Sequence, residues 1–219
     1  MVQPWKNLSI SAKLYFVVGI MASLILVELF TLRFAMDKLS AVRAFVAGEG
    51  LWTKAQKQAV YQLQRYVLTR DEADFRAYEA ALSVNEGDHI ARLELMKPKP
   101  DMAIVRKGFL QGEIHGDDIV PMVDLLRRFG HVSYIAEAIQ AWTEGDQLIA
   151  ELRRVASECH RAISSGQHDP DTQRALTLRI EGINARLSVV TAHFSSVLGE
   201  GSRWLERLVL MALFALVLT

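Results

Sequence analysis

A motif typical of metal chemistry occurs once in this chain. The segment Glu86-Gly87-Asp88-His89 has the spacing E-x-x-H, which di-iron helical bundles use for their ligands. Such a site needs two of these units and two further glutamates, and this unit contains a helix-weakening glycine. The single cysteine, Cys159, excludes an internal disulfide and argues against a cysteine-based metal site. We therefore predict no metal and no cofactor.

Motifs for nucleotide binding and covalent catalysis are incomplete. The phosphate-loop pattern G-x-x-x-x-G-K-[S/T] is absent, and the Gly-x-Gly pairs at 48–50 and 199–201 lack the third glycine and the preceding strand of a dinucleotide fingerprint. The six histidines are scattered along the chain. We expect a protein that is not an enzyme.

Two groups of residues are better suited to binding. The first combines stacking surfaces with hydrogen-bond donors on long helical segments, where it would hold an anionic or aromatic ligand; it consists of Trp52, Gln56, Arg65, Tyr66 and Trp142. The alternative for this group is ordinary amphipathic packing. The second lies in a polar loop and the helix after it, and consists of His115, Asp117, Arg127 and Arg128. Its alternative is a plain turn with a helix cap.

The elements that carry these residues lie between two apolar ends. The chain has 219 residues, 51% hydrophobic and 23% charged, and its mean hydropathy is +0.14. Residues 14–32 contain one charge, Glu28, and span roughly 28 Å as a helix, close to the thickness of a bilayer core. We predict a transmembrane helix over 14–36. A cleaved signal peptide is the alternative, but its apolar region would be shorter.

The second apolar run, 208–219, carries no charge and is too short to cross a bilayer. We expect it to be the start of a second transmembrane helix that is cut off at Thr219, with a cytoplasmic portion beyond. Lys6 and Lys13 precede the first run without an acidic residue, so the positive-inside rule places residues 1–13 in the cytoplasm. Residues 37–207 would then lie in the periplasm.

The exported region is patterned for helices. Apolar residues recur at three- and four-residue steps, as at Leu39, Val42 and Val46, and no segment alternates like a strand. The first membrane helix is predicted to run without a break to about Leu68. The predicted stops and starts that follow are a capping box at Thr69 and Glu72, an interruption at 85–87, an N-cap at Asp101, an N-cap at Asp118 with Pro121 in the first turn, a stop at Gly130, a long helix from Ser133 to about Ser165, and an N-cap at Asp169.

These elements predict an all-α fold. Both membrane segments fix their ends of the chain on one side, so up-down packing closes the helices into an antiparallel, four-helix-type periplasmic bundle. Its long outer helices would be continuous with the two transmembrane helices. About 170 residues suffice for one core of this kind.

Several stretches within 49–207 are similar to a known kind of region. They include GFLQGEIHGDDI at 108–119 and LLRRFGHVSYIAEAIQAWTEGDQLIAEL at 125–152. This region resembles the helical periplasmic sensor region of two-transmembrane bacterial signalling proteins, namely hybrid sensor histidine kinases, diguanylate cyclases or phosphodiesterases, and chemoreceptor-like sensors. The resemblance implies a sensory role, but it brings no agreed ligand and no functional residue.

The function we predict is therefore a sensor module in the bacterial inner membrane. A periplasmic small molecule or protein would be detected and the signal passed by helix displacement to a cytoplasmic histidine kinase or cyclic-di-GMP enzyme. We expect a homodimer in contact with the lipid bilayer. The net charge of zero does not favour a nucleic-acid partner. The alternative is a membrane-anchored structural or adaptor protein that docks a periplasmic partner.

Overall fold

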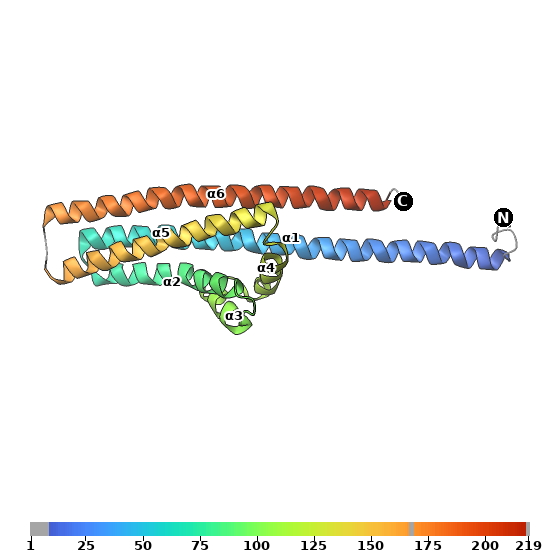
Figure 1. Ribbon diagram of the computed structural model, residues 1–219, viewed down its shortest axis with the longest axis horizontal. Coiled ribbons are helices and arrows are strands. Elements are labelled where there is room, and N and C mark those ends of the chain that lie inside the picture. The colour runs from blue at the N-terminus through green and yellow to red at the C-terminus, as the bar shows by residue number, and fades with distance from the viewer. Residues whose placement is uncertain (1–8, 167–168, 218–219) are drawn as a thin grey trace.

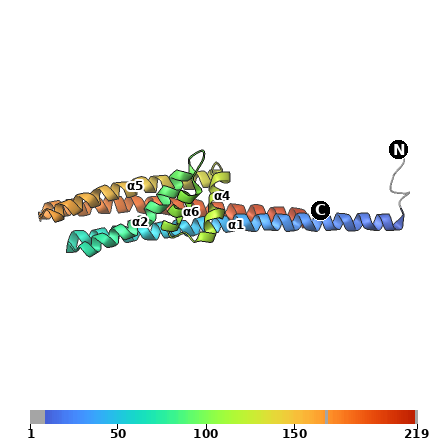
Figure 2. The same cartoon turned by 90° about the horizontal axis from the view of Figure 1, so that it is seen from below.

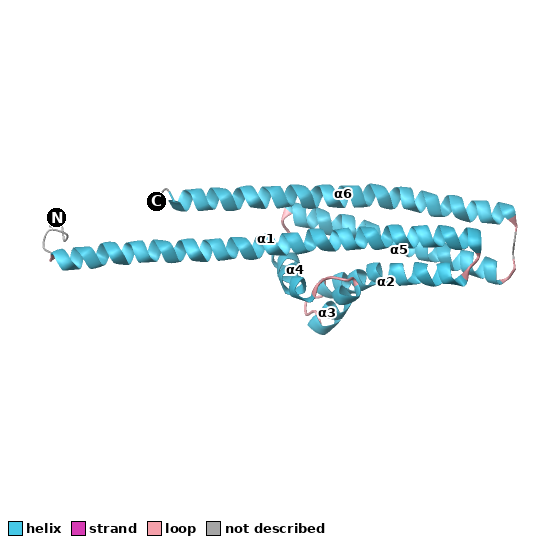
Figure 3. Cartoon of the chain, turned by 180° about the vertical axis from the view of Figure 1, so that it is seen from behind, coloured by secondary structure: helices cyan, strands magenta, loops and turns pink. Residues whose placement is uncertain are grey.

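The protein is all-helical. The computed structural model describes residues 9–166 and 169–217, which contain six helices and no strand (Figure 1). The helices are α1 (Ile10–Thr69), α2 (Glu72–Leu95), α3 (Met102–Gln111), α4 (Gly116–Phe129), α5 (Ser133–Ser164) and α6 (Pro170–Val217). The connecting segments are short (Figure 3).

Helix α1 is unbroken over 60 residues, a length of about 90 Å. The Ser9 side chain caps its start by accepting from the amide of Ala12. Its end is set by Arg70, whose backbone takes the left-handed conformation (φ 60°) and donates to the carbonyl of Tyr66. The prediction of one continuous helix to about residue 68 is confirmed.

The start of α2 differs from the predicted capping box. The N-cap is Asp71, whose side chain accepts from the amide of Ala73 at 2.8 Å. Thr69 instead accepts from the amide of Asp71 and donates to the carboxylate of Asp74. Since Arg70 turns the chain, the last residue of α1 cannot also cap α2, and the cap falls two residues further on.

The interruption predicted at 85–87 is wrong, because α2 continues through it to Leu95. Asn85 is buried and donates to the carbonyl of Trp52 at 2.9 Å. Gly87 lies where α2 meets α3, and a Cβ on it would stand 2.5 Å from the carbonyl oxygen of Gly108. The glycine therefore permits a close approach of two backbones and does not end the helix.

Helix α3 begins as predicted, with Asp101 accepting from the amide of Ala103. The predicted cap of α4 is wrong by three residues. His115 is the N-cap, through its Nδ1 and the amide of Asp117, and Asp118 lies inside the first turn, where its charge suits the helix dipole. Pro121 consequently lies inside the helix and not in its first turn.

The last two helices match their predicted limits closely. Gly130 follows α4, and α5 runs from Ser133 to Ser164. The Asp169 side chain accepts from the amide of Thr172 at 2.9 Å before α6 begins at Pro170. Gln167 and His168, part of the predicted stop, lie outside the described residues.

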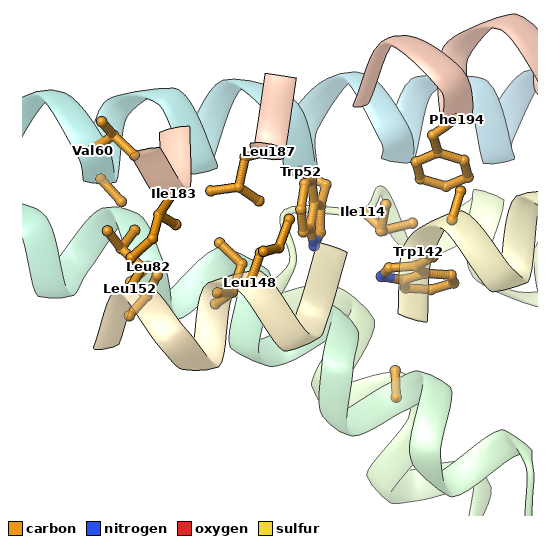
Figure 4. Packing of buried hydrophobic residues seen from close by; sticks show 14 of the residues in the cluster. Trp52, Val60, Leu82, Ile114, Trp142, Leu148, Leu152, Ile183, Leu187 and Phe194 are labelled. Atoms are coloured by element: carbon orange, nitrogen blue, oxygen red, sulfur yellow. The ribbon is translucent and has the colours of Figure 1, made fainter. Parts of the chain in front are cut away.

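The four longest helices lie side by side and consecutive ones run in opposite directions (Figures 1 and 2). Helix α1 packs against α2 and α6, and α6 packs against α5. Helices α3 and α4 form a side lobe, with α3 against α2 and α4 against α1. One hydrophobic core joins all of them (Figure 4).

The apolar end of α1 projects from this core on the side where α6 also ends (Figure 1). Among the described residues, α1 is the one helix long and apolar enough to cross a membrane by length and composition, and none of that stretch is buried. A signal sequence near the N-terminus meets the same criteria. Lys6 of the predicted cytoplasmic flank and residues 218–219 of the second run lie outside the described residues. The two-span topology therefore stays a prediction.

Candidate functional site

A small cavity lies at the centre of the bundle, and the four longest helices all contribute to it. Its volume of about 10 Å³ is on the scale of a single water molecule. The side chains that line it include Glu49, Trp52, Asp88, Trp142 and Phe194. Figure 4 shows Trp52, Trp142 and Phe194 gathered with Ile114 in this part of the core. We call this the central cavity.

Two of the predicted binding residues meet here. Trp52 from α1 and Trp142 from α5 are both buried, although 90 positions separate them in the chain. Gly145 leaves the space that the Trp52 ring fills, since a Cβ there would lie 2.8 Å from that ring. Neither indole Nε1 has a hydrogen-bond partner among the described residues. Two residues that line the cavity therefore each carry a buried N–H donor whose hydrogen bond is open.

A carboxyl group faces the same cavity. Asp88 on α2 is 3% exposed, and its Oδ1 has no partner among the described residues. Burial raises the pKa of this carboxyl well above its usual value, and the neighbouring charge of Asp146 raises it further. Gly112 packs directly against this carboxyl group, since a Cβ at Gly112 would stand 2.0 Å from Oδ1 of Asp88. Burial therefore favours the neutral form of Asp88 over the ionised form.

A buried ion pair stands beside Asp88. The guanidinium of Arg92 donates to Oδ2 of Asp146 through Nε at 3.0 Å and Nη2 at 2.6 Å, and both side chains are buried. Arg92 also donates to Thr143 at 3.0 Å and lies 5.7 Å from the ring centre of Trp142. His89 adds a hydrogen bond to Asp146 at 2.8 Å. This network joins α2 to α5 next to the cavity.

Glu49 links the cavity to α6. It is a buried carboxylate on α1 whose Oε1 accepts from Thr53 at 2.8 Å and from Ser195 of α6 at 2.9 Å. Phe194, the neighbour of Ser195, packs against Phe45 with ring centres 5.9 Å apart. Polar and apolar contacts at one level of the bundle therefore connect α1 with α6.

The other residues of the first predicted group lie elsewhere. Gln56 is buried and its Nε2 is 3.5 Å from Oδ1 of Asn184. Tyr66 lies near the far end of α1, about 21 Å along the helix from Trp52, and its hydroxyl contacts His160 at 2.9 Å and donates to Glu72 at 3.1 Å. Burial and Glu72 raise the pKa of Tyr66 to about 12.

Arg65 is half-exposed and pairs with Asp74 at 3.2 Å. It lies beside Tyr66 at the far end of α1 and away from the cavity. The first predicted group is therefore only partly brought together.

The second predicted group is divided between the two ends of α4. His115 and Asp117 are exposed at its start, about 18 Å along the helix from Arg127. Arg127 and Arg128 are exposed at its end and line a surface groove between α3 and α4 that Met102 and Val120 also line. One binding site cannot use all four of these side chains at once.

Four residues at or beside the cavity were not predicted as site residues, namely Glu49, Asp88, Arg92 and Asp146. The spacing between acidic residues and tryptophans in the sequence could have indicated two of them. Glu49 precedes Trp52 by three residues and Asp146 follows Trp142 by four, which places each acid on the same helix face as a tryptophan. A charged residue on the face that carries a large aromatic side chain indicates a polar position inside a core.

Comparison with known proteins identifies no relative of this chain. No protein family, no curated protein and no solved structure matches the chain. Among the described residues no group of three or more His, Cys, Asp or Glu side chains is placed to hold a metal ion. The fold and the site together define a helical protein with a small, mostly apolar cavity inside its core, lined also by the acidic residues Glu49 and Asp88, and with an exposed apolar helix end.

Proposed function

We propose that this protein is a transmembrane sensor module. Residues 37–207 would form an antiparallel bundle in the periplasm, standing on two helices in the inner membrane, and the protein would act as a homodimer. A ligand or partner would bias two arrangements of the bundle, and the displacement of α1 and α6 would reach a cytoplasmic histidine kinase or cyclic-di-GMP enzyme. The resemblance described above supports the same class.

One observation carries the proposal. The helices that line the central cavity include α1 and α6, and these are the helices whose apolar ends leave the bundle on the same side. Since a helix transmits axial and rotational displacement along its length, a change at Glu49 or Trp52 is communicated toward residue 36. A difference of about 1–3 kcal/mol in ligand affinity between two arrangements is enough for such coupling.

The polar groups at the cavity give the bundle a physical basis for two arrangements. Asp88 and the two indole N–H groups are buried with open hydrogen bonds, and an unsatisfied buried polar group costs about 1–3 kcal/mol. A small repacking can give these groups hydrogen-bond partners in a second arrangement. The free energy gained in this way offsets the strain that the repacking creates elsewhere. The two states can then lie close in free energy.

Distances between the apolar ends test the proposal. Spin labels at Leu26 of α1 and Met211 of α6, both exposed, would be measured in lipid nanodiscs with Cys159 replaced by alanine. We expect Asp88→Asn to shift the distance distribution by about 1–2 Å, the size of known interhelical shifts. Asp171→Asn, an exposed change at the start of α6, is the control. An unchanged distribution in Asp88→Asn would count against a cavity coupled to the membrane helices.

A second function, docking of a periplasmic protein without signal transmission, is favoured by apolar side chains on the side lobe. Exposed apolar residues of the side lobe include Met102 and Leu110 of α3 and Val120 of α4. Leu93 of α2 and Met96, which follows α2, are exposed as well. Exposed apolar surface of this kind is typical of protein contacts. In this case charge substitution at Val120 would abolish partner binding, while the Leu26–Met211 distance would stay the same with and without the partner.

A further inference from the structure

A second and larger cavity lies at the base of the bundle, where α1 and α6 leave the core. Its volume is about 280 Å³, within reach of a small ligand. The floor consists of buried side chains from α1, α4 and α6, namely Val42, Phe45, Leu125, Val197 and Leu198. The rim includes Phe34 and Trp204, which are exposed. We call this the base pocket.

The wall of the base pocket is suited to a hydrocarbon chain. Its side chains are aliphatic or aromatic almost throughout, and Lys38 is the one charged residue that lines it. The rim residues Phe34 and Leu208 belong to the apolar stretches of α1 and α6. The pocket is thus continuous with the surface that is expected to face lipid, and an apolar chain can enter without crossing water.

The mouth of the pocket carries excess positive charge. The ammonium of Lys38 pairs with Asp124 at 2.7 Å and lies over the rings of Phe34 and Phe129 at 5.4 and 5.3 Å. Arg128 pairs with the same carboxylate. One acid therefore serves two cations.

Arg127 supplies a further positive charge in the neighbouring groove between α3 and α4. It is exposed, and it lines the same groove as Asp124 and Arg128. Neither Arg127 nor Arg106 of this groove forms a salt bridge within the described residues. Their guanidinium groups can therefore bind an anion without breaking an existing ion pair.

We propose that the base pocket binds an amphiphile that has one hydrocarbon chain and an anionic head. The chain fills the apolar pocket, and the phosphate or carboxylate head is held by Arg127, Arg128 and Lys38 at the mouth. The proposal rests on the proposed function in one respect, because it takes the apolar stretch of α1 to lie in a membrane that supplies the ligand.

The charges select against other ligands. A quaternary ammonium head is disfavoured because the aromatic faces of Phe34 and Phe129 already hold the Lys38 ammonium and two further cations stand nearby. A ligand without charge would fill the pocket but make no use of the arginines. An anionic head with a single chain satisfies both parts of the site.

Quenching of tryptophan fluorescence tests the proposal, because Trp204 stands at the rim. The full chain in detergent micelles would be titrated with lysophosphatidylglycerol and with lysophosphatidylcholine of the same brominated chain. We expect half-maximal quenching at a mole fraction about tenfold lower for the glycerol head, a difference of about one decade in affinity. Trp204→Phe removes this quenching component. Equal quenching by the two lipids overturns the proposal.

Surface variants separate the head site from the pocket. Arg127→Gln together with Arg128→Gln changes two exposed side chains, and we expect the preference for the anionic head to fall to within about twofold. Arg174→Gln, an exposed arginine at the far end of α6, is the matched control and keeps the preference. Ser202→Phe narrows the pocket and weakens quenching by both lipids. Retention of the full preference in the double variant overturns the assignment.

A brominated fatty acid identifies the source of the head group. Quenching equal to that of lysophosphatidylglycerol shows that any anionic head suffices, and weaker quenching shows that the lipid phosphate is required; both results support an anionic amphiphile. The sensor proposal is tested separately by the Leu26–Met211 distance. A protein that binds the amphiphile selectively without a distance change keeps this inference and loses the sensor role.

Discussion

Asp88 is the residue in which burial and charge conflict most directly. A carboxyl group at 3% exposure loses its hydration, and an ionised form would lie near the carboxylate of Asp146 without a cation of its own. Arg92 donates to Asp146 through two nitrogens and to Thr143 through the third. Burial and the neighbouring charge of Asp146 therefore both favour the protonated form of Asp88, in which the carboxyl can donate a hydrogen bond.

Stability should fall with rising pH because of this proton. The pKa of Asp88 is about 3.8 when unfolded and well above that when folded, so between the two values the folded state binds more protons. The free energy of unfolding then decreases as pH rises through this window, by up to about 1.4 kcal/mol per pH unit. We expect Asp88→Asn to remove that decline, as measured by thermal unfolding in detergent from pH 4.5 to 8.

Asp171→Asn provides the comparison for this experiment. Asp171 is exposed in the first turn of α6, so the decline should persist in that variant. If stability depends on pH in the same way in the wild-type protein and in Asp88→Asn, the folded state does not hold a proton on Asp88.

Helices α2 and α3 cross at a pair of glycines. Cβ atoms built on Gly87 and Gly108 would each lie about 2.5 Å from the other residue's carbonyl oxygen, and Asp88 follows Gly87 directly. This crossing brings α3 against α2 and places Gly112 next to the carboxyl of Asp88. The burial of Asp88 thus depends on how closely two helices approach.

Gly87→Ala should destabilise the protein, because the new methyl group meets backbone atoms that have no rotamer by which to move aside. We expect a loss of about 1–3 kcal/mol, measured as a lower midpoint of thermal unfolding. Gly182→Ala in α6 is the control, since a Cβ there meets nothing within 4 Å. It should stabilise by about 0.5–1 kcal/mol through helix propensity. Equal effects of the two substitutions would refute the close crossing.

The molecule as a whole is an asymmetric rod with its core at one end. Helix α1 leaves the core and continues as an exposed apolar helix, and α6 ends beside it (Figure 2). Among the described residues, this projection is the one stretch long and apolar enough to cross a membrane by length and composition.

Leu24→Arg should reduce membrane retention of the full chain. Leu24 lies within the apolar stretch and is exposed, and a central arginine costs about 2.5–3.5 kcal/mol on insertion scales. We expect the sedimenting fraction to fall severalfold while the helix content of the bundle is kept. Gln147→Arg, an exposed change on α5, should leave sedimentation unaltered. Sedimentation of both variants like the wild type would contradict membrane insertion through this stretch.

Local chemistry in the sequence predicts most helix limits. Asp101 and Asp169 cap α3 and α6 as expected, and Gly130 follows α4. Such signals act over three or four residues, so the residues that decide them are neighbours in the chain. The all-helical class follows from the same short-range periodicity.

The features that the sequence pattern could not predict depend on contacts between segments that are distant in the chain. The local sequence around Gly87 is compatible both with a helix break and with a close crossing of two helices. The contact with Gly108 of α3 decides between them. Trp52 and Trp142 were predicted to belong to one binding group, but their meeting around Asp88, without the other members of that group, follows from the packing of α1, α2 and α5. Burial is a property of the assembled core, because the desolvation that changes Asp88 comes from residues far away in the chain.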